Sequence, residues 1–192
     1  MATETLIIAT GVPLGAEAGT PVAHGNPHAL IRVAGQFLRV PVEMYELWLG
    51  RCFADGDDLS DWAAHLGLDL EEEDIDRLAA LRLVLRVPTE DVARSRAVLA
   101  LVRLLPVGVC RGSVAAEPWR FAVDVAYDTT LELGGVAYLI WAHSDGVTSL
   151  ATVAELTAAS TGLAIEQVIR SLLEEIVPTL LLSGGAYVDW MP

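Results

Sequence analysis

The chain has 192 residues, of which 53% are hydrophobic, and it carries a formal net charge of −14 at pH 7. This hydrophobic content can build the core of one large domain or of two domains of about 90 residues each. The first 14 residues lack the basic region of a signal peptide, and no uninterrupted apolar stretch reaches the roughly 20 residues of a membrane-spanning helix. The composition therefore predicts a soluble, cytoplasmic protein that does not enter a membrane.

The charge is distributed unevenly along the chain. Residues 1–120 contain 11 arginines and 17 acidic residues, whereas residues 121–192 contain 9 acidic residues and one arginine, Arg170. Proteins bind DNA largely by neutralising its phosphates with lysine and arginine. The second part of the chain is therefore a poor candidate for binding nucleic acid.

The chain also matches itself when it is shifted by 93 positions. Residues 6–48 align without gaps on residues 99–141 and keep nine identities, among them Leu38 with Leu131, Tyr45 with Tyr138 and Trp48 with Trp141. The same alignment pairs Pro13 with Pro106, Gly15 with Gly108 and Gly19 with Gly112. This self-similarity predicts two copies of one small unit.

The first copy opens with the apolar, β-prone run Thr5 to Thr10, after which Gly11 begins a loop through Pro27. Two further strands are expected at Ala29 to Val33 and Gln36 to Val40, around an Ala34-Gly35 turn. Apolar spacing of 3.6 residues then predicts three helices, at Val42 to Phe53, Leu59 to Leu66 and Leu70 to Leu85.

The second copy repeats this order after a short connecting helix that starts at Pro88, with Thr89 as its expected cap. We expect strands at Val98 to Val109, Trp119 to Ala126 and Thr129 to Leu133, with a turn at Tyr127-Asp128. Helices should follow at Gly135 to His143, Leu150 to Ser160 and Ala164 to Ile176. The segments Leu180 to Ser183 and Ala186 to Trp190 are expected to pair as a terminal hairpin around Gly184-Gly185.

This order of elements predicts an α+β protein of two tandem winged helix-turn-helix units, each a small antiparallel sheet with three helices. The expected domains are residues 1–87 and residues 98–192, joined by a connecting helix at residues 88–97.

The third helix of such a unit normally reads DNA with Arg, Lys, Asn and Gln side chains. In the first copy this helix instead starts with the acidic run Asp69 to Asp76, which either repels DNA or forms a solvated helix terminus. The alternative is that the first copy's arginines gather on one surface for nucleic acid: Arg77, Arg82, Arg86, Arg94, Arg96 and Arg103.

The second copy contains the run Leu131 to Trp141, then Asp145-Gly146, then Val153-Ala154-Glu155-Leu156. These motifs resemble the pyrroloquinoline-quinone chaperone family and the related peptide-recognition elements of ribosomal peptide biosynthesis. The resemblance covers roughly residues 119–183, and the first copy follows it less closely. The family unit is normally single, and its Leu-Asn before the first helix is Leu133-Gly134 here.

The resemblance implies that an extended leader peptide is bound as an added strand while the third helix closes the groove. Carried onto the second copy, the strand edge is Ala122 to Thr130, with helix residues facing it. The implied peptide-binding residues are Ala122, Val123, Asp124, Val125, Ala126, Thr129, Ile165, Val168, Ile169 and Leu172 in the second copy, and Leu30, Arg32, Asp74 and Leu78 in the first. Each of these residues could instead belong to the core.

No catalytic or metal-binding set emerges from the sequence. His143-Ser144-Asp145 has the residue types of a triad, but sequence neighbours do not converge as a nucleophile, base and orienter must. The segment His24 to His28 offers two imidazoles without a third metal ligand of matching spacing. Cys52 and Cys110 follow no redox or metal spacing and are expected to be buried thiols. The sequence predicts no cofactor and no enzyme activity.

The leading hypothesis is therefore a non-enzymatic adaptor that binds a peptide or protein and presents a precursor peptide to a modifying enzyme. The alternative is a winged-helix transcription regulator or a protein that mimics DNA. Exposed strand edges and high apolar content also favour a homodimer.

Overall fold

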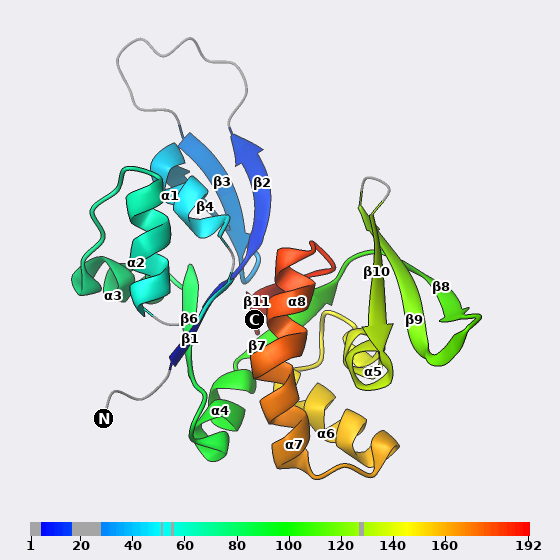
Figure 1. Ribbon diagram of the computed structural model, residues 1–192. Coiled ribbons are helices and arrows are strands. Elements are labelled where there is room, and N and C mark those ends of the chain that lie inside the picture. The colour runs from blue at the N-terminus through cyan, green and yellow to red at the C-terminus, as the bar shows by residue number, and fades with distance from the viewer. Residues whose placement is uncertain (1–4, 17–27, 51, 55, 127–128) are drawn as a thin grey trace.

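The computed structural model describes residues 5–16, 28–50, 52–54, 56–126 and 129–192 (Figure 1). The expected turn at Tyr127-Asp128 and most of the loop that ends at Pro27 lie outside these residues. In the first copy the strands and helices are β1 (Thr5–Ala9), β2 (Val12–Ala16), β3 (His28–Val33), β4 (Gln36–Pro41), α1 (Val42–Trp48), β5 (Cys52–Phe53), α2 (Gly56–His65), α3 (Glu72–Ala80) and β6 (Val84–Pro88).

Helix α4 (Val92–Leu99) leads into the second copy. Its elements are β7 (Val102–Pro106), β8 (Val109–Val114), β9 (Glu117–Ala126), β10 (Thr129–Gly134), α5 (Gly135–His143), α6 (Leu150–Thr161), α7 (Ile165–Ser171), the π-helical segment η1 (Leu172–Ile176), α8 (Val177–Leu182) and β11 (Ala186–Trp190). The prediction of a mixed α+β protein is confirmed.

The two copies share most of their element order and strand pairing, except that β5 of the first copy pairs with β1 and has no counterpart among the described strands of the second copy. In each copy a three-stranded antiparallel meander, β2–β3–β4 or β8–β9–β10, precedes the helices. The opening strand then pairs with a strand that returns after the helices, β1 with β6 and β7 with β11. Figure 1 shows the two meanders on either side of the central β7–β11 pair and α8.

Near the start of each copy, the residues that are equivalent in the structure are not 93 positions apart. Val12 pairs with Arg32 as Val109 pairs with Asp124, so these opening residues are equivalent at a shift of 97. The positive φ angles agree with this register, because Gly11 (+103°) corresponds to Gly108 (+114°). The alignment of Gly15 with Gly108 is therefore wrong. Leu38 and Leu131 are equivalent in the structure as well, because Leu38 pairs with Ile31 as Leu131 pairs with Val123.

Several predicted boundaries in the first copy are wrong. Strand β2 occupies part of the expected loop. Helix α1 ends at Trp48, and the chain then folds so that the Phe53 ring lies against Gly50, where an added Cβ would be 2.4 Å from it. Helix α3 ends at Ala80, where Arg82 adopts a φ of +58° and the Leu83 amide donates to the Leu78 carbonyl. Of the remainder of the expected third helix, residues 81–83 form a turn, and Val84 and Leu85 begin the strand β6.

In the second copy, the expected first strand at Val98 to Val109 is present but shorter, because Val98 and Leu99 end helix α4 and the strand β7 covers Val102–Pro106. The N-cap of α4 is Asp91, whose side chain accepts the Arg94 amide, and not Thr89. The expected terminal hairpin is also wrong, because Leu180 to Leu182 belong to α8 and β11 pairs with β7.

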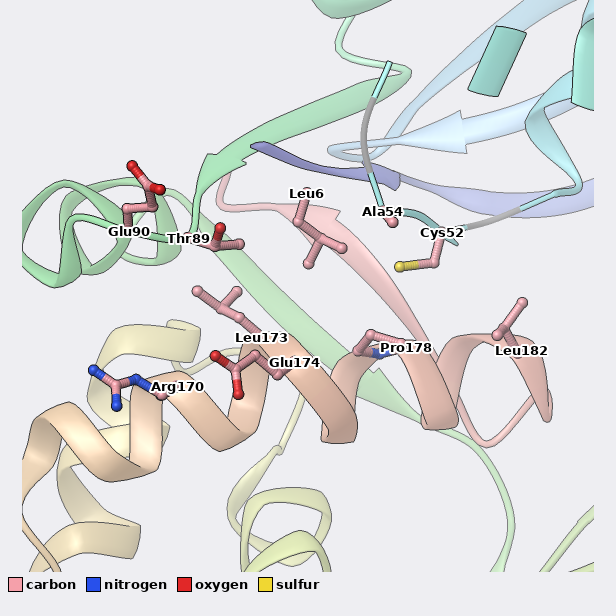
Figure 2. A pocket seen from close by; sticks show the side chains of 10 residues that line it. All are labelled: Leu6, Cys52, Ala54, Thr89, Glu90, Arg170, Leu173, Glu174, Pro178 and Leu182. Carbon is pink, nitrogen blue, oxygen red and sulfur yellow. The ribbon is translucent and has the colours of Figure 1, made fainter. Parts of the chain in front are cut away.

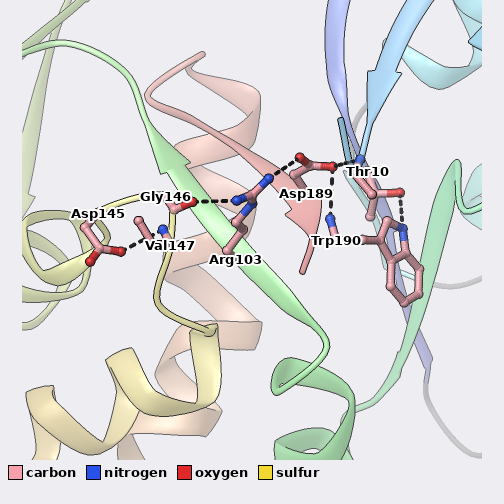
Figure 3. Close-up of polar contacts among 8 residues, drawn as sticks. Thr10, Arg103, Asp145, Gly146, Val147, Asp189 and Trp190 are labelled. Carbon is pink, nitrogen blue, oxygen red and sulfur yellow. Dashed lines mark hydrogen bonds and ion pairs between the residues drawn. The ribbon is translucent and has the colours of Figure 1, made fainter. Parts of the chain in front are cut away.

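The C-terminal strand β11 connects the two copies (Figure 3). Val188 forms a parallel bridge with Thr10, and its carbonyl accepts the Gly11 amide at 2.6 Å. The Trp190 indole Nε1 donates to the Thr10 hydroxyl at 3.0 Å and to the Arg82 carbonyl at 2.9 Å. One core cluster accordingly combines residues of the second copy with β1 and β6, and Trp190 packs against the other cluster.

Candidate functional site

A groove of about 570 Å³ lies between the first copy and the long helical segment of the second copy (Figure 2). Both copies contribute to its walls. Ten residues line it: Leu6, Cys52, Ala54, Thr89, Glu90, Arg170, Leu173, Glu174, Pro178 and Leu182. Its middle is apolar, whereas Glu90, Arg170 and Glu174 place charges toward one end, as Figure 2 shows.

A second hollow of about 510 Å³ adjoins this groove and shares Cys52 and Leu182 with it. The remaining lining residues come from α2 and from the segment that joins α1 to it: Leu49, Gly50, Phe53, Asp58, Asp61, Trp62 and His65. The Trp62 and His65 rings stack with their centroids 5.7 Å apart. The two hollows form one surface that extends from α2 of the first copy to α7 of the second.

The helical wall of the groove runs through α7, η1 and α8 without a break. At its start the Gln167 side chain accepts the Ala164 amide at 3.1 Å. Leu173 and Glu174 lie in the π-helical turn, and Pro178 follows in the first turn of α8. Single π-helical turns inside α-helices are frequent at functional sites, and this one faces the groove.

The walls carry more acidic than basic side chains. Glu90 and Glu174 line the larger hollow beside Arg170, and Asp58 and Asp61 line the smaller one. Leu182 is 66% exposed although it borders both hollows. An apolar floor between acidic walls is suited to an apolar segment that carries positive charges.

Cys52 lies where the two hollows meet. Burial, together with the nearby Asp58 carboxylate, raises the pKa of the Cys52 thiol to about 12. The thiolate is the reactive form of cysteine, so at neutral pH Cys52 acts as a small apolar side chain. Cys52 and Cys110 are both free thiols, and they are half-buried where the sequence predicted buried thiols.

The strand predicted to bind the peptide in the second copy is the central strand of its meander. Residues 121–124 of β9 pair with β10 on one side and with β8 on the other. The expectation of an unpaired edge is therefore wrong for Ala122, Val123 and Asp124. The pairing of β9 with β8 ends at Asp124, and Val125 and Ala126 lie beyond it. Thr129 is the first residue of β10 and is exposed.

The predicted helix residues of the second copy lie mainly in the core. Val168 and Leu172 are 0% exposed and Ile169 is 1% exposed, whereas Ile165 is half-buried. These side chains pack inside the second copy and are not available to a partner.

The predicted residues of the first copy fall into two places. Leu30 and Arg32 lie on β3, which is again a central strand. Asp74 and Leu78 line a separate hollow of about 320 Å³ between α1 and α3, together with Met44 and Leu70 among others. The structure thus brings Asp74 and Leu78 together, but it separates them from the outer face of β3.

His143, Ser144 and Asp145 each have a local structural contact. The Ser144 hydroxyl donates to the Ile140 carbonyl at 2.7 Å, and His143 Nδ1 lies 3.4 Å from the Thr157 hydroxyl. The Thr148 and Val147 amides donate to Asp145 and hold its pKa below the usual value. Within the described residues, no group of three or more His, Cys, Asp or Glu side chains could hold a metal ion.

The arginines that a nucleic-acid surface would need are engaged by other groups. Ion pairs join Arg77 to Asp74, Arg86 to Glu72 and Asp76, Arg94 to Asp91, Arg96 to Glu155, and Arg103 to Asp189. Arg82 lies over the Trp190 ring, 5.5 Å from its centroid. This pairing weakens the case for a basic DNA-binding surface.

The residues of the groove include several that sequence reasoning missed, namely Leu6, Thr89, Glu90 and Leu182. The sequence could have indicated Leu182, because Pro178 is compatible with the first turn of a helix and so allows the helical segment to continue past Ile176.

None of the described helices is long and apolar enough to span a membrane. The chain matches no family model, and no curated protein or solved structure is significantly similar to it.

Proposed function

We propose that this protein is a non-enzymatic adaptor that binds a peptide segment in the groove between its two copies. The observation that carries this proposal is the joined pair of hollows, which has an apolar floor and acidic walls and receives residues from both copies. Grooves of this kind bind peptides through apolar anchors, and charged rims orient them. The two copies are interpreted as tandem winged-helix units whose contact creates the site.

The preferred peptide carries apolar side chains flanked by lysine or arginine. Glu90, Glu174, Asp58 and Asp61 supply the complementary charges, and Leu182 offers an exposed apolar contact at the junction of the hollows. The resemblance to peptide-recognition elements suggests a precursor peptide as the occupant, which the adaptor presents to a modifying enzyme. Binding in the groove replaces strand addition to β9, whose central backbone is already paired.

Selection from a random peptide library displayed on phage, with the full chain as bait, tests this proposal. We expect enrichment of peptides that combine apolar and basic residues. A selected peptide, titrated by fluorescence anisotropy, should lose affinity at least about tenfold to L182R, a change of about 1.4 kcal/mol in binding free energy.

The matched control is L163R, because Leu163 is also an exposed leucine, at 41%, and lies outside the residues that line the groove. This variant should bind the peptide as the wild type does. Equal affinity for both variants, enrichment of acidic peptides or no enrichment at all would contradict the proposal.

A further inference from the structure

The hollow of about 320 Å³ between α1 and α3 lies wholly within the first copy, and its lining is mostly apolar. The apolar lining residues include Met44, Leu47, Leu68, Leu70 and Leu78. Leu47 and Leu78 are each only 3% exposed and belong to the core of the first copy, so the hollow has a firm apolar floor. Pockets that bind small molecules have volumes from about 300 Å³ upward and combine such a lining with a few polar groups.

The carboxylates that line this hollow are not balanced by basic side chains. Asp74 pairs with Arg77 at 3.0 Å, so the charges of these two residues offset each other. Glu43 and Asp69 also line the hollow, are exposed, and form no ion pair with any described residue. Their two uncompensated negative charges favour a ligand with a cationic group over a neutral or an anionic ligand.

Comparison with the second copy shows that the cap of α3 does not require a charge. Asp74 Oδ2 accepts the Glu71 amide at 3.2 Å, and the Gln167 side chain accepts the Ala164 amide at 3.1 Å. Both pairs are 93 positions apart and lie at the N-termini of the equivalent helices α3 and α7. A neutral side chain therefore makes the same hydrogen bond in the second copy that a carboxylate makes in the first.

Helix α1 shows the same difference between the copies. Helices α1 and α5 begin at residues 42 and 135, so they are equivalent at the shift of 93. Leu47 and Ile140 correspond in this alignment and are both buried, as the packing of each core requires. The residue that corresponds to Glu43 is Val136. Packing thus preserved the apolar floor, whereas the carboxylates are specific to the first copy.

We propose that the hollow between α1 and α3 binds a small molecule that carries a primary amine on an apolar chain. The chain lies against Leu47 and Leu78, and its ammonium group faces the carboxylates of Glu43 and Asp69. A small molecule fits this hollow because its volume is well below the 570 and 510 Å³ of the two joined hollows assigned to a peptide. The proposal is independent of the peptide groove, because the two sites share no lining residue.

Ligands with one chain and different head groups test the role of charge. Hexylamine, hexanol and hexanoate are titrated to about 10 mM into the isotope-labelled full chain, and the backbone amide shifts are followed by NMR. Hexylamine should bind with a dissociation constant on the order of 1 mM and shift residues 41–47 and 68–78. Hexanol should bind about fivefold more weakly, and hexanoate should not bind. Butylamine should lose about fourfold in affinity for each methylene group that it lacks.

A matched pair of double variants tests the two carboxylates. E43Q/D69N removes both charges from the hollow and should weaken hexylamine binding about fivefold. The control E46Q/E73Q removes the same net charge from exposed glutamates of α1 and α3 that do not line the hollow, and it should bind hexylamine as the wild type does. All four side chains are exposed, and thermal unfolding confirms that both variants are folded.

Several results would overturn the proposal. These are the absence of hexylamine binding, equal affinity for the three head groups, amide shifts outside the hollow, and equal losses in the two double variants. Nα-acetyl-lysine N-methylamide presents the same ammonium group on a lysine side chain. Tighter binding of this compound than of hexylamine would assign the hollow to a lysine of a protein partner and would overturn the assignment to a small molecule.

Discussion

Asp189 is the residue on which the junction between the copies most depends. Its side chain is 0% exposed, lies 3.1 Å from the Arg103 guanidinium and accepts the Ala34 amide at 2.7 Å (Figure 3). Arg103 in turn donates to the Gly146 carbonyl at 2.9 Å. The sequence showed only an acidic residue beside Trp190, because its partners lie 86 and 155 positions away. Long-range polar contacts of this kind have no local sequence signal.

Replacing Asp189 with alanine should destabilise the protein by about 3 to 5 kcal/mol, because it leaves a largely buried guanidinium and a buried amide without their acceptor. Asp189→Asn should cost less, because the amide oxygen can still accept from Ala34. Urea unfolding followed by fluorescence measures both changes. As a control, Glu166→Ala removes an exposed carboxylate and should change the free energy of unfolding by less than about 0.5 kcal/mol. A loss for Asp189→Ala no larger than that of the control would refute the role of Asp189 at the junction.

At the scale of elements, the sequence predicted those with clear periodicity or turn signals. Strands β3 and β4, on either side of the Ala34-Gly35 turn, and helix α5 lie where they were expected. The errors concern short apolar runs such as Val84–Pro88, which periodicity alone does not distinguish from helix. The structure makes this run a strand because it pairs with β1, and that pairing depends on residues about 80 positions away. The predicted terminal hairpin is wrong for the same reason, because β11 pairs with the distant strand β7.

The meander of the second copy depends on a close backbone approach at Gly108. A Cβ at Gly108 would lie 2.3 Å from the Asp124 carbonyl, whereas a Cβ at Gly112 would meet nothing within 4 Å. Both residues have positive φ angles, +114° and +104°, so alanine should cost each about 1 to 3 kcal/mol of backbone strain. Gly108→Ala should lose about 1 to 3 kcal/mol more through the steric clash. Thermal or urea unfolding of the two variants checks this difference, and equal losses would show that β8 and β9 do not approach so closely.

At the scale of the whole molecule, the duplication was visible in the sequence and the groove was not. Tyr45 and Tyr138, like Trp48 and Trp141, indicated two copies because they repeat at a fixed separation within one element. The groove instead joins Leu6 and Cys52 of the first copy to Leu173 and its neighbours in the second. Its position depends on how the copies pack, and that packing is determined by β11 and its contacts with Thr10, Arg82 and Ala34.

We propose that the two copies together form one peptide-binding groove. Amide hydrogen exchange, measured with and without a saturating concentration of a selected peptide, tests it most directly. We expect slower exchange in both copies at once, at residues 52–54 beside β1 and along the helical wall from Arg170 to Leu182. Slower exchange confined to one copy, at the edge of β10 or in the hollow between α1 and α3, would contradict the shared groove.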